Sequence, residues 1–533
     1  MRFAIVSLPG LSLNTNAPRI TVKKEPAIGR GSNSRVIFLL LGVAVYLYLN
    51  LFSLPDTPFL LGDDQVYFWM DAERMLDGGR IYQDFFQFTP PGTDLIYLAL
   101  FKQFGLSLWT TNCVVLVLGI ASCWLCFVLA SEVVERRSAV LTTALFLVLI
   151  YGKLLDGTHH LFSAFAIMGA VKIYTRNATF ARIVISGTLL GVASFFTQTH
   201  GAVAYLAFAV FFFWRRSREH QPWLHLLQKM WWLSLGYTVT LLLLAAPFIA
   251  TIGWKQLWYY QIIYVGKHVI PMRPGMMGLP GISSWRDLPR FGQAVLVYLF
   301  LPVVYLLTLW RCWRERRPAA FPWEQITLMS LVGFFLMVEV AFNLNFLRLY
   351  SISLAGIVLL VWHLEQTRMM RPYAVAVMWI AISALAVWQT ISAHKLQPRK
   401  IHLPSGEVAT GEQAYEKLHW MTEHTRPGQF LFQAAWPAMY LPLQLRNPMF
   451  VDQIYPADGT PTDEVALTIQ QLEVKQVPYV LWAARLGSMD NLSVRPKDHV
   501  VPLRAYLHSQ YSEEHTFPDG DQVWHRNGFK TVP

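Results

Sequence analysis

The chain has 533 residues, of which 54% are hydrophobic and only 14% are charged, and it contains 20 Trp and 34 Phe. This composition argues against a soluble enzyme and is typical of a polytopic membrane protein. The net charge of +11 does not indicate nucleic-acid binding, because from Ala393 onward 13 Lys and Arg face 15 Asp and Glu. The basic excess therefore belongs to the membrane half, where loop charges set the topology.

Residues 1–34 are basic and contain Pro, Ser and Asn, without the small-residue cleavage site of a signal peptide. We interpret them as a disordered cytoplasmic leader. The region 35–392 carries the apolar runs, each of which we interpret as a membrane span, although several are shorter than a straight crossing needs. These runs cover 35–54, 106–130, 138–151, 161–174, 183–197, 201–214, 230–252, 291–310, 323–342, 350–363 and 373–391.

Arginines occur in every second loop between these runs. The positions are Arg136/Arg137, Arg176/Arg182, Arg215/Arg216/Arg218, Arg311/Arg314/Arg316/Arg317 and Arg368/Arg371. Because cytoplasmic loops carry an excess of Lys and Arg, we expect these loops and the leader to face the cytoplasm. About 11 spans then place the C-terminal region on the extracytoplasmic side of the inner (plasma) membrane.

Two large outer loops are expected, over 56–105 and 253–290. Residues 92–105 of the first loop are too short to cross the bilayer, and we interpret them as a helix that lies on the membrane surface. The second loop is aromatic, basic and interrupted by Pro and Gly. Both loops therefore belong to the outer face of a transmembrane domain that extends over 35–392.

Residues 393–533 have the pattern of a soluble α/β domain. The stretches QFLFQAA and YVLWAA indicate buried strands, residues 462–474 indicate a helix between them, and HTFPDGDQVWH indicates a hairpin around Asp519 and Gly520. The predicted fold is thus a polytopic α-helical membrane protein with a C-terminal soluble α/β domain.

Two adjacent carboxylates, Asp63 and Asp64, follow the first apolar run directly. A charge at this depth is costly unless it is solvated, paired or used. Capping of the following helix needs only one Asp. We therefore favour a functional role for the pair, at the depth of a lipid headgroup.

The segment that begins at this pair resembles the first outer loop of the GT-C membrane glycosyltransferases. It is most similar to the dolichyl-phosphate-mannose protein mannosyltransferase-like group, which includes the bacterial aminoarabinose transferases. The shared features, in chain order, are the acidic pair, Leu76-Gly78-Gly79-Tyr82, Pro90-Pro91 and Phe104-Gly105. The expected span count and C-terminal outer domain also match this family.

The resemblance implies inverting transfer of a single sugar from a polyprenyl-phosphate donor to a hydroxyl acceptor, which could be protein, lipid or glycan, at the outer membrane face. It assigns the general base to Asp63, with Asp64 as a supporting carboxylate. A polyprenyl phosphate leaves as an anion and needs no general acid, so a carboxylate and cations suffice. Many family members carry a phosphate-binding Lys where this chain has Thr89.

The phosphate cations must therefore come from elsewhere in this chain. Lys267, His268 and Arg273 of the second outer loop are candidates, with solvated loop charges as the alternative. Arg348, beside Tyr350 at the outer edge of a span, is another candidate, and simple snorkelling to the membrane surface would also explain it. We expect Arg348 and Lys267 to hold the phosphate.

A short outer loop contains Lys153, Asp156, His159 and His160. Adjacent His residues are poor metal co-ligands, so we expect no cofactor, although a divalent metal stays open. Asp156 is either a second functional carboxylate, as the family implies, or a turn residue before Gly157.

Two rival functions stay open at this stage. A transporter or lipid-linked sugar flippase predicts charges at mid-span and a repeated half, and neither is evident. A polymerase or ligase that moves a whole oligosaccharide differs only in the size of its donor and acceptor.

Overall fold

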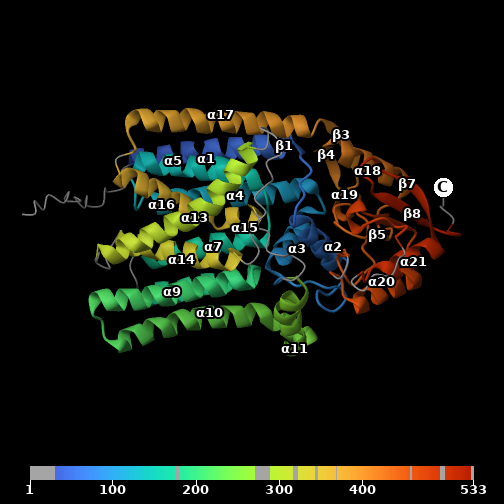
Figure 1. Cartoon of the computed structure of the whole chain (residues 1–533), viewed down its shortest axis with the longest axis horizontal. Coiled ribbons are helices and arrows are strands. Elements are labelled where there is room, and N and C mark those ends of the chain that lie inside the picture. The colour runs from blue at the N-terminus through green and yellow to red at the C-terminus, as the bar shows by residue number, and fades with distance from the viewer. Residues whose placement is uncertain are drawn as a thin grey trace, which may run out of the picture.

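The computed structural model describes residues 30–175, 179–269, 288–315, 322–341, 346–367, 369–456, 459–491 and 498–529. Most of the leader and Arg273 lie outside the described residues. Long helices run side by side through one half of the molecule, and a small sheet with its own helices lies at one end of them (Figure 1). The first outer loop lies where these two parts meet.

Each apolar run expected from the sequence lies largely within a helix of this bundle. The helices are α1 (Arg30–Leu51), α4 (Leu108–Ala130), α5 (Arg136–Phe146) with η1 (Leu147–Tyr151) and α6 (Gly152–Leu154), α7 (His159–Thr175), α8 (Phe180–Phe196), α9 (Gln198–Glu219), α10 (Trp223–Ile252), α13 (Leu288–Arg314), α14 (Trp323–Ala341), α15 (Phe346–Ser351), α16 (Ser353–Gln366) and α17 (Pro372–Leu396). Within the described ranges, 5 helical stretches are long and apolar enough to cross a membrane by length and composition. The chain is therefore a mostly helical protein with membrane-type helices, and the count of 11 crossings stays a prediction.

Small residues let two of these helices approach closely. A Cβ on Gly187 of α8 would lie 2.2 Å from the Leu233 carbonyl oxygen, and one on Gly236 of α10 would lie 2.3 Å from that of Val184. Larger side chains at these positions would separate the two backbones. Small residues are common where membrane helices cross, for the same reason. A third close approach involves Gly92, the first residue of α3 (Gly92–Phe104), where a Cβ would lie 2.7 Å from the carbonyl oxygen of Phe195 in α8.

The segments on the outer side of the bundle are short. A two-stranded ribbon, β1 (Phe52–Ser53) and β2 (Thr57–Pro58), leads from α1 to α2 (Gln65–Leu76) and α3 (Gly92–Phe104). After α10 the chain forms α11 (Trp254–Trp258) and the π-helix η2 (Tyr259–Val269).

The C-terminal region begins with a hairpin, β3 (Arg399–Leu403) and β4 (Gly406–Thr410), which the sequence analysis did not predict. A second sheet follows with the strand order β5-β6-β8-β7, in which only β5 and β6 are parallel. The helix predicted over 462–474 is α20. The elements are α18 (Glu412–His424), β5 (Leu431–Gln433), α19 (Tyr440–Leu443), α20 (Thr462–Val474), β6 (Tyr479–Trp482), η4 (Ala484–Leu486), α21 (Val501–Gln510), β7 (Tyr511–Thr516) and β8 (Gln522–Arg526).

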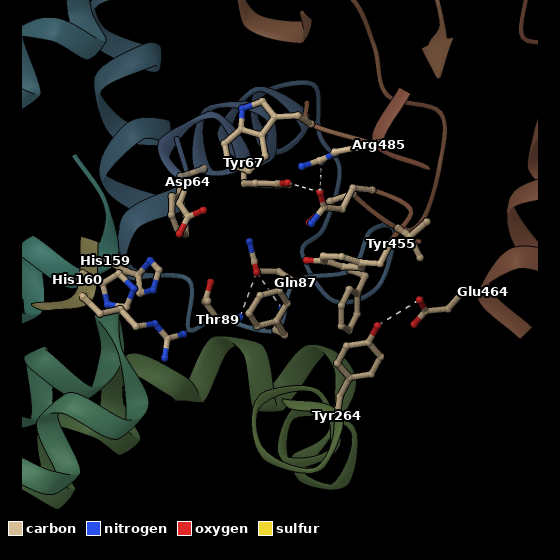
Figure 2. Close-up of a pocket in the computed structure, with 18 residues that line it drawn as sticks. Asp64, Tyr67, Gln87, Thr89, His159, His160, Tyr264, Tyr455, Glu464 and Arg485 are labelled. Carbon is tan, nitrogen blue, oxygen red and sulfur yellow. Dashed lines mark hydrogen bonds between the residues drawn. The ribbon is translucent and has the colours of Figure 1, made fainter. Parts of the chain in front are cut away.

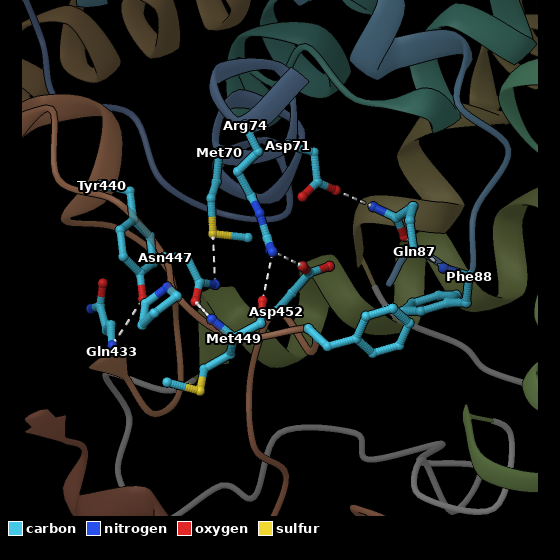
Figure 3. Close-up of polar contacts among 12 residues, drawn as sticks. Met70, Asp71, Arg74, Gln87, Phe88, Gln433, Tyr440, Asn447, Met449 and Asp452 are labelled. Carbon is cyan, nitrogen blue, oxygen red and sulfur yellow. Dashed lines mark hydrogen bonds and ion pairs between the residues drawn. The ribbon is translucent and has the colours of Figure 1, made fainter. Parts of the chain in front are cut away.

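The first outer loop and the C-terminal region share one hydrophobic core. Trp69 and Met70 of α2, each 1% exposed, pack in the same cluster as Leu418 and Leu431. These side chains of α2 thus pack against protein and not against lipid. Polar contacts join the same elements, because Asn447 donates to the Met70 sulfur at 3.3 Å (Figure 3).

Candidate active site

A cavity of about 220 Å³ lies where the helical bundle, the first outer loop and the C-terminal region meet. Figure 2 shows its walls: His159 and His160 lie on one side, and Arg485, Tyr455 and Glu464 lie on the other. The lining residues are Asp64, Tyr67, Phe68, Phe86, Gln87, Phe88, Thr89, His159, His160, Tyr264, Arg348, Trp436, Val451, Asp452, Gln453, Tyr455, Glu464 and Arg485.

The two adjacent carboxylates occupy different positions. Asp64 precedes the first residue of α2, but its side chain does not cap the helix, and it lines the cavity. Asp63 has a left-handed backbone (φ 58°) and is not among the described residues that line the cavity. Partial burial raises the pKa of Asp63 above its usual value. The capping explanation for the pair is thus not met by Asp64, whose carboxylate faces the cavity.

Asp156 lies close to the same carboxylates. Burial, followed by the negative charge of Asp64, raises the pKa of Asp156 well above its usual range. The Thr158 hydroxyl donates to its Oδ2 at 2.9 Å, and the Gly157 amide donates to Gln65 of α2 at 3.2 Å. A raised pKa disfavours the charged carboxylate that a general base needs, so the environment of Asp156 suits a supporting position better than that of the base.

One side of the cavity carries an arginine and two histidines from the helical bundle. Arg348 lines the cavity together with His159 and His160, whose rings are 4.0 Å apart. Thr89, at the position where the resemblance implies a phosphate-binding Lys, also lines the cavity, and its hydroxyl has no hydrogen-bond partner within the described chain. This side therefore offers a guanidinium, two imidazoles and a hydroxyl to an anionic group.

The other described residues that were predicted to bind the substrate do not line the cavity. Lys267 is exposed, and the ring of His268 lies 4.8 Å from that of Tyr264 at the outer end of η2. Tyr350 is 4% exposed. None of these three is among the described residues that line the cavity. Of the predicted cations that lie within the described residues, Arg348 is thus the one that lines the same cavity as Asp64.

The far wall of the cavity comes from residues that the sequence analysis did not single out. They are Trp436, Asp452, Gln453, Tyr455, Glu464 and Arg485, all from the C-terminal region. The stretch VDQIYPAD, which is more polar and aromatic than a core strand, was the available signal. Burial raises the pKa of Glu464 to about 7, and Tyr264 donates to its Oε2 at 3.2 Å.

A second group of carboxyls lies behind this wall. Burial raises the pKa of Asp71 to about 7, and burial together with the charge of Asp71 raises the pKa of Asp94 well above its usual range. Gln87 donates to Asp71 at 2.8 Å (Figure 3). Within the described ranges, no group of three or more His, Cys, Asp or Glu side chains is arranged to hold a metal ion.

The fold of this chain is similar to those of solved GT-C glycosyltransferases, so the resemblance is confirmed at the level of the fold. ArnT from Cupriavidus metallidurans bound to undecaprenyl phosphate superposes with a TM-score of 0.59 and 13% identity, covering 94% of this chain and 100% of that one. The apo form of the same ArnT superposes with a TM-score of 0.57 and 13% identity, and the match covers 93% of this chain and 98% of that one. The Archaeoglobus fulgidus oligosaccharyltransferase in complex with Zn and sulfate superposes with a TM-score of 0.52 and 13% identity, and the match covers 92% of this chain and 73% of that one.

A scan of protein-family models finds no match to the sequence, and a search of curated proteins finds none. At 13% identity the structural likeness establishes the fold. The chemistry has to be argued from the cavity itself.

Proposed function

We propose that this chain is an inverting glycosyltransferase that moves a single sugar from a polyprenyl-phosphate donor to a hydroxyl acceptor at the outer face of the inner membrane. The observation that carries this proposal is that Asp64 and Arg348, which are far apart in the sequence, line one cavity. A base and a cation in the same cavity are the two groups that this reaction needs.

The proposed reaction is a single displacement. The acceptor oxygen attacks the anomeric carbon while the bond from that carbon to the phosphate oxygen breaks, and the prenyl phosphate leaves with the electron pair. The acceptor proton passes to a carboxylate. Arg348, with the imidazoles of His159 and His160 beside it, would stabilise the negative charge of the leaving phosphate.

Two arguments bear on which carboxylate takes the proton. The family resemblance assigns this role to Asp63. The cavity favours Asp64, because Asp64 lines it and Asp63 is not among its described lining residues. A general base must come within hydrogen-bond reach of the proton that it removes. We therefore propose Asp64 as the base, with Asp63 and Asp156 as its supports.

The donor class is supported by the fold. The ArnT structure with the higher TM-score is bound to undecaprenyl phosphate, and this chain covers all of that relative. We extend the proposal to 11 crossings, to the domains 35–392 and 393–533, and to a groove for the prenyl chain beside α11 and η2. The exposed aromatic residues Trp254 and Trp258 of α11 suit such a lipid-facing groove.

The test is a transfer assay with the full-length protein in lipid nanodiscs. Undecaprenyl-phosphate monosaccharides with a labelled sugar are incubated with an envelope extract as the source of acceptor. We expect one donor to be consumed, with inversion at the anomeric carbon, at equal rates with and without EDTA. The matched control is Asp490→Asn, because Asp490 is exposed on the C-terminal region. Transfer of a whole oligosaccharide, or equal turnover by the Asp63→Asn/Asp64→Asn double variant, would contradict the proposal.

A further inference from the structure

The side-chain amide of Gln453 has a fixed orientation in the far wall of the cavity. The Tyr67 hydroxyl and Nη2 of Arg485 both donate to its Oε1, the latter at 3.3 Å (Figure 2). Because arginine can only donate hydrogen bonds, the shared atom must be the amide oxygen. The amide nitrogen donates to no group in the described chain, so it can donate to a molecule in the cavity that Gln453 lines.

An aromatic surface lies next to this amide. The ring of Trp436 meets that of Tyr67 edge to face at 5.2 Å, and the Arg485 guanidinium lies 5.6 Å from the Trp436 ring centroid. Trp436 is half-buried and lines the cavity. Tyr67 and Arg485 thus contact both the indole and the amide and orient them relative to each other.

The polar groups around this surface include both hydrogen-bond donors and hydrogen-bond acceptors. The Gln453 amide nitrogen can donate a hydrogen bond, whereas Glu464 and Asp452 supply carboxyl oxygens to the same cavity. An acyl chain would leave these groups without partners, which is costly inside a cavity. A sugar ring matches them, because its C–H face packs on an indole and its hydroxyls both donate and accept hydrogen bonds.

The position of this surface indicates which substrate it binds. In an inverting displacement the acceptor oxygen and the leaving phosphate lie on opposite sides of the anomeric carbon. His159 and His160 lie on one side of the cavity, and Arg485 and Tyr455 lie on the other (Figure 2). If the phosphate is at the histidine side, then the acceptor enters from the side of Trp436 and Gln453.

We infer that Tyr67, Trp436, Gln453 and Arg485 form the acceptor subsite and that this subsite binds a neutral sugar, so that the acceptor hydroxyl belongs to a carbohydrate. The inference rests on the proposed function, because it takes the phosphate to be at the histidine side. It narrows the acceptor from protein, lipid or glycan to a molecule whose reactive end is a sugar.

Binding is tested with the full-length protein in nanodiscs by saturation-transfer NMR, using the methyl glycosides of glucose, mannose, galactose and xylose as probes. Gln453→Glu keeps an oxygen for Tyr67 and Arg485 but removes the amide donor. The matched control is Gln510→Glu on the exposed end of α21. We expect at least one glycoside to bind, about tenfold more weakly to Gln453→Glu and to Trp436→Ala, and equally well to the control and to Asp64→Asn.

The outcomes separate this inference from the proposed function. No binding by any glycoside, or equal binding by Gln453→Glu and wild type, overturns the inference. Displacement of the glycoside by the sugar-linked donor but not by an acceptor would assign the surface to the donor sugar and would also overturn the inference. Sugar transfer to an unglycosylated peptide would overturn it as well. If Asp64-dependent transfer occurs and Gln453→Glu leaves the acceptor KM unchanged, the inference fails and the proposed function stands. If glycosides bind as expected but no donor is consumed, the proposed function fails.

Discussion

Arg74 of α2 and Asp452 of the C-terminal region form an ion pair with 3.3 Å between Nη1 and Oδ1, and their side chains are only 13% and 11% exposed. Arg74 also donates to the Met449 carbonyl oxygen at 2.5 Å, and its guanidinium lies 4.3 Å from the centroid of the Phe85 ring. One side chain thus connects the first outer loop to the far wall of the cavity (Figure 3). Because Asp452 lines the cavity, the pair also sets the position of that wall.

Replacement of Arg74 by Met should therefore destabilise the outer part of the protein. The change removes the partner of a largely buried carboxyl group and the hydrogen bond to Met449, and such losses typically cost about 3–5 kcal/mol. Thermal unfolding in detergent, followed by near-UV circular dichroism, measures the effect. The control is Arg80→Met, because the pair of Arg80 with Asp84 is mostly exposed and should contribute little. An unchanged melting temperature in Arg74→Met would show that the pair does not hold the two parts together.

Glu73 should make the stability of this region depend on pH. Burial, with the nearby charge of Asp77, raises the pKa of Glu73 from 4.5 to about 8. Between these two values the folded protein keeps a proton that the unfolded chain has released, so stability falls as the pH rises through this window and levels off above it. The loss is on the order of a few kcal/mol.

The measurement compares unfolding midpoints at pH 6 and pH 9 for the wild type and for Glu73→Gln. In Glu73→Gln the difference between the two midpoints should be much smaller, because the amide is neutral at both pH 6 and pH 9. Glu423→Gln is the control, since Glu423 is 58% exposed on α18. A wild-type midpoint that rises with pH would contradict the assignment.

The sequence was sufficient for the bundle and for much of the C-terminal region, because both depend on local patterns. Long apolar runs and the helix over 462–474 were visible without tertiary information. The environment of α2 was not visible, since an apolar helix face with Trp69 and Met70 fits a lipid surface as well as a protein core. Only the burial of both residues at 1% exposure against the C-terminal cluster separates these cases.

The candidate site shows the same limit. Asp64 and Arg348 could be proposed from their places at the ends of apolar runs and from the resemblance. Trp436, Gln453 and Arg485 could not, because no periodicity or motif connects them to a carboxylate that lies several hundred positions earlier in the chain. Their role follows only from the contacts of Tyr67 and Arg485 with Gln453.

Arg348 should control the affinity for the donor. Arg348→Ala removes a charged partner of the proposed phosphate, and charge-assisted hydrogen bonds contribute enough to raise the donor KM by about tenfold or more. Arg348→Lys should be intermediate, because a point charge replaces a planar fork. Initial rates at varied donor concentration measure the effect, with Lys267→Ala as the comparison at an exposed position. Unchanged donor kinetics in Arg348→Ala would leave Arg348 as a snorkelling residue.

The orientation in the membrane is open to a direct test. The alternating arginine loops predict that Arg216 lies in the cytoplasm, so a reporter that functions only in the cytoplasm should be active when it is fused after Arg216. A reporter fused after Ala393 should be active only outside it. Paired fusions to alkaline phosphatase and green fluorescent protein measure both sites. Finding the two positions on the same side would contradict the odd number of crossings between the leader and the C-terminal region.

The last prediction concerns the carboxylate that accepts the proton. Asp64 lines the cavity that also holds Arg348, and its side chain does not cap α2. Asp64→Asn keeps the shape of the side chain but cannot take a proton from the acceptor, so the transfer rate should fall at least about a hundredfold with the donor KM nearly unchanged. Asp63→Asn should have a smaller effect, because Asp63 is not among the described residues that line the cavity. Single-turnover transfer from a labelled donor measures both variants.

If Asp63→Asn is inactive while Asp64→Asn turns over normally, the base is Asp63, as the family resemblance implies, and the assignment from the cavity is wrong. If both single variants are active and the double variant is inactive, either carboxylate can accept the proton.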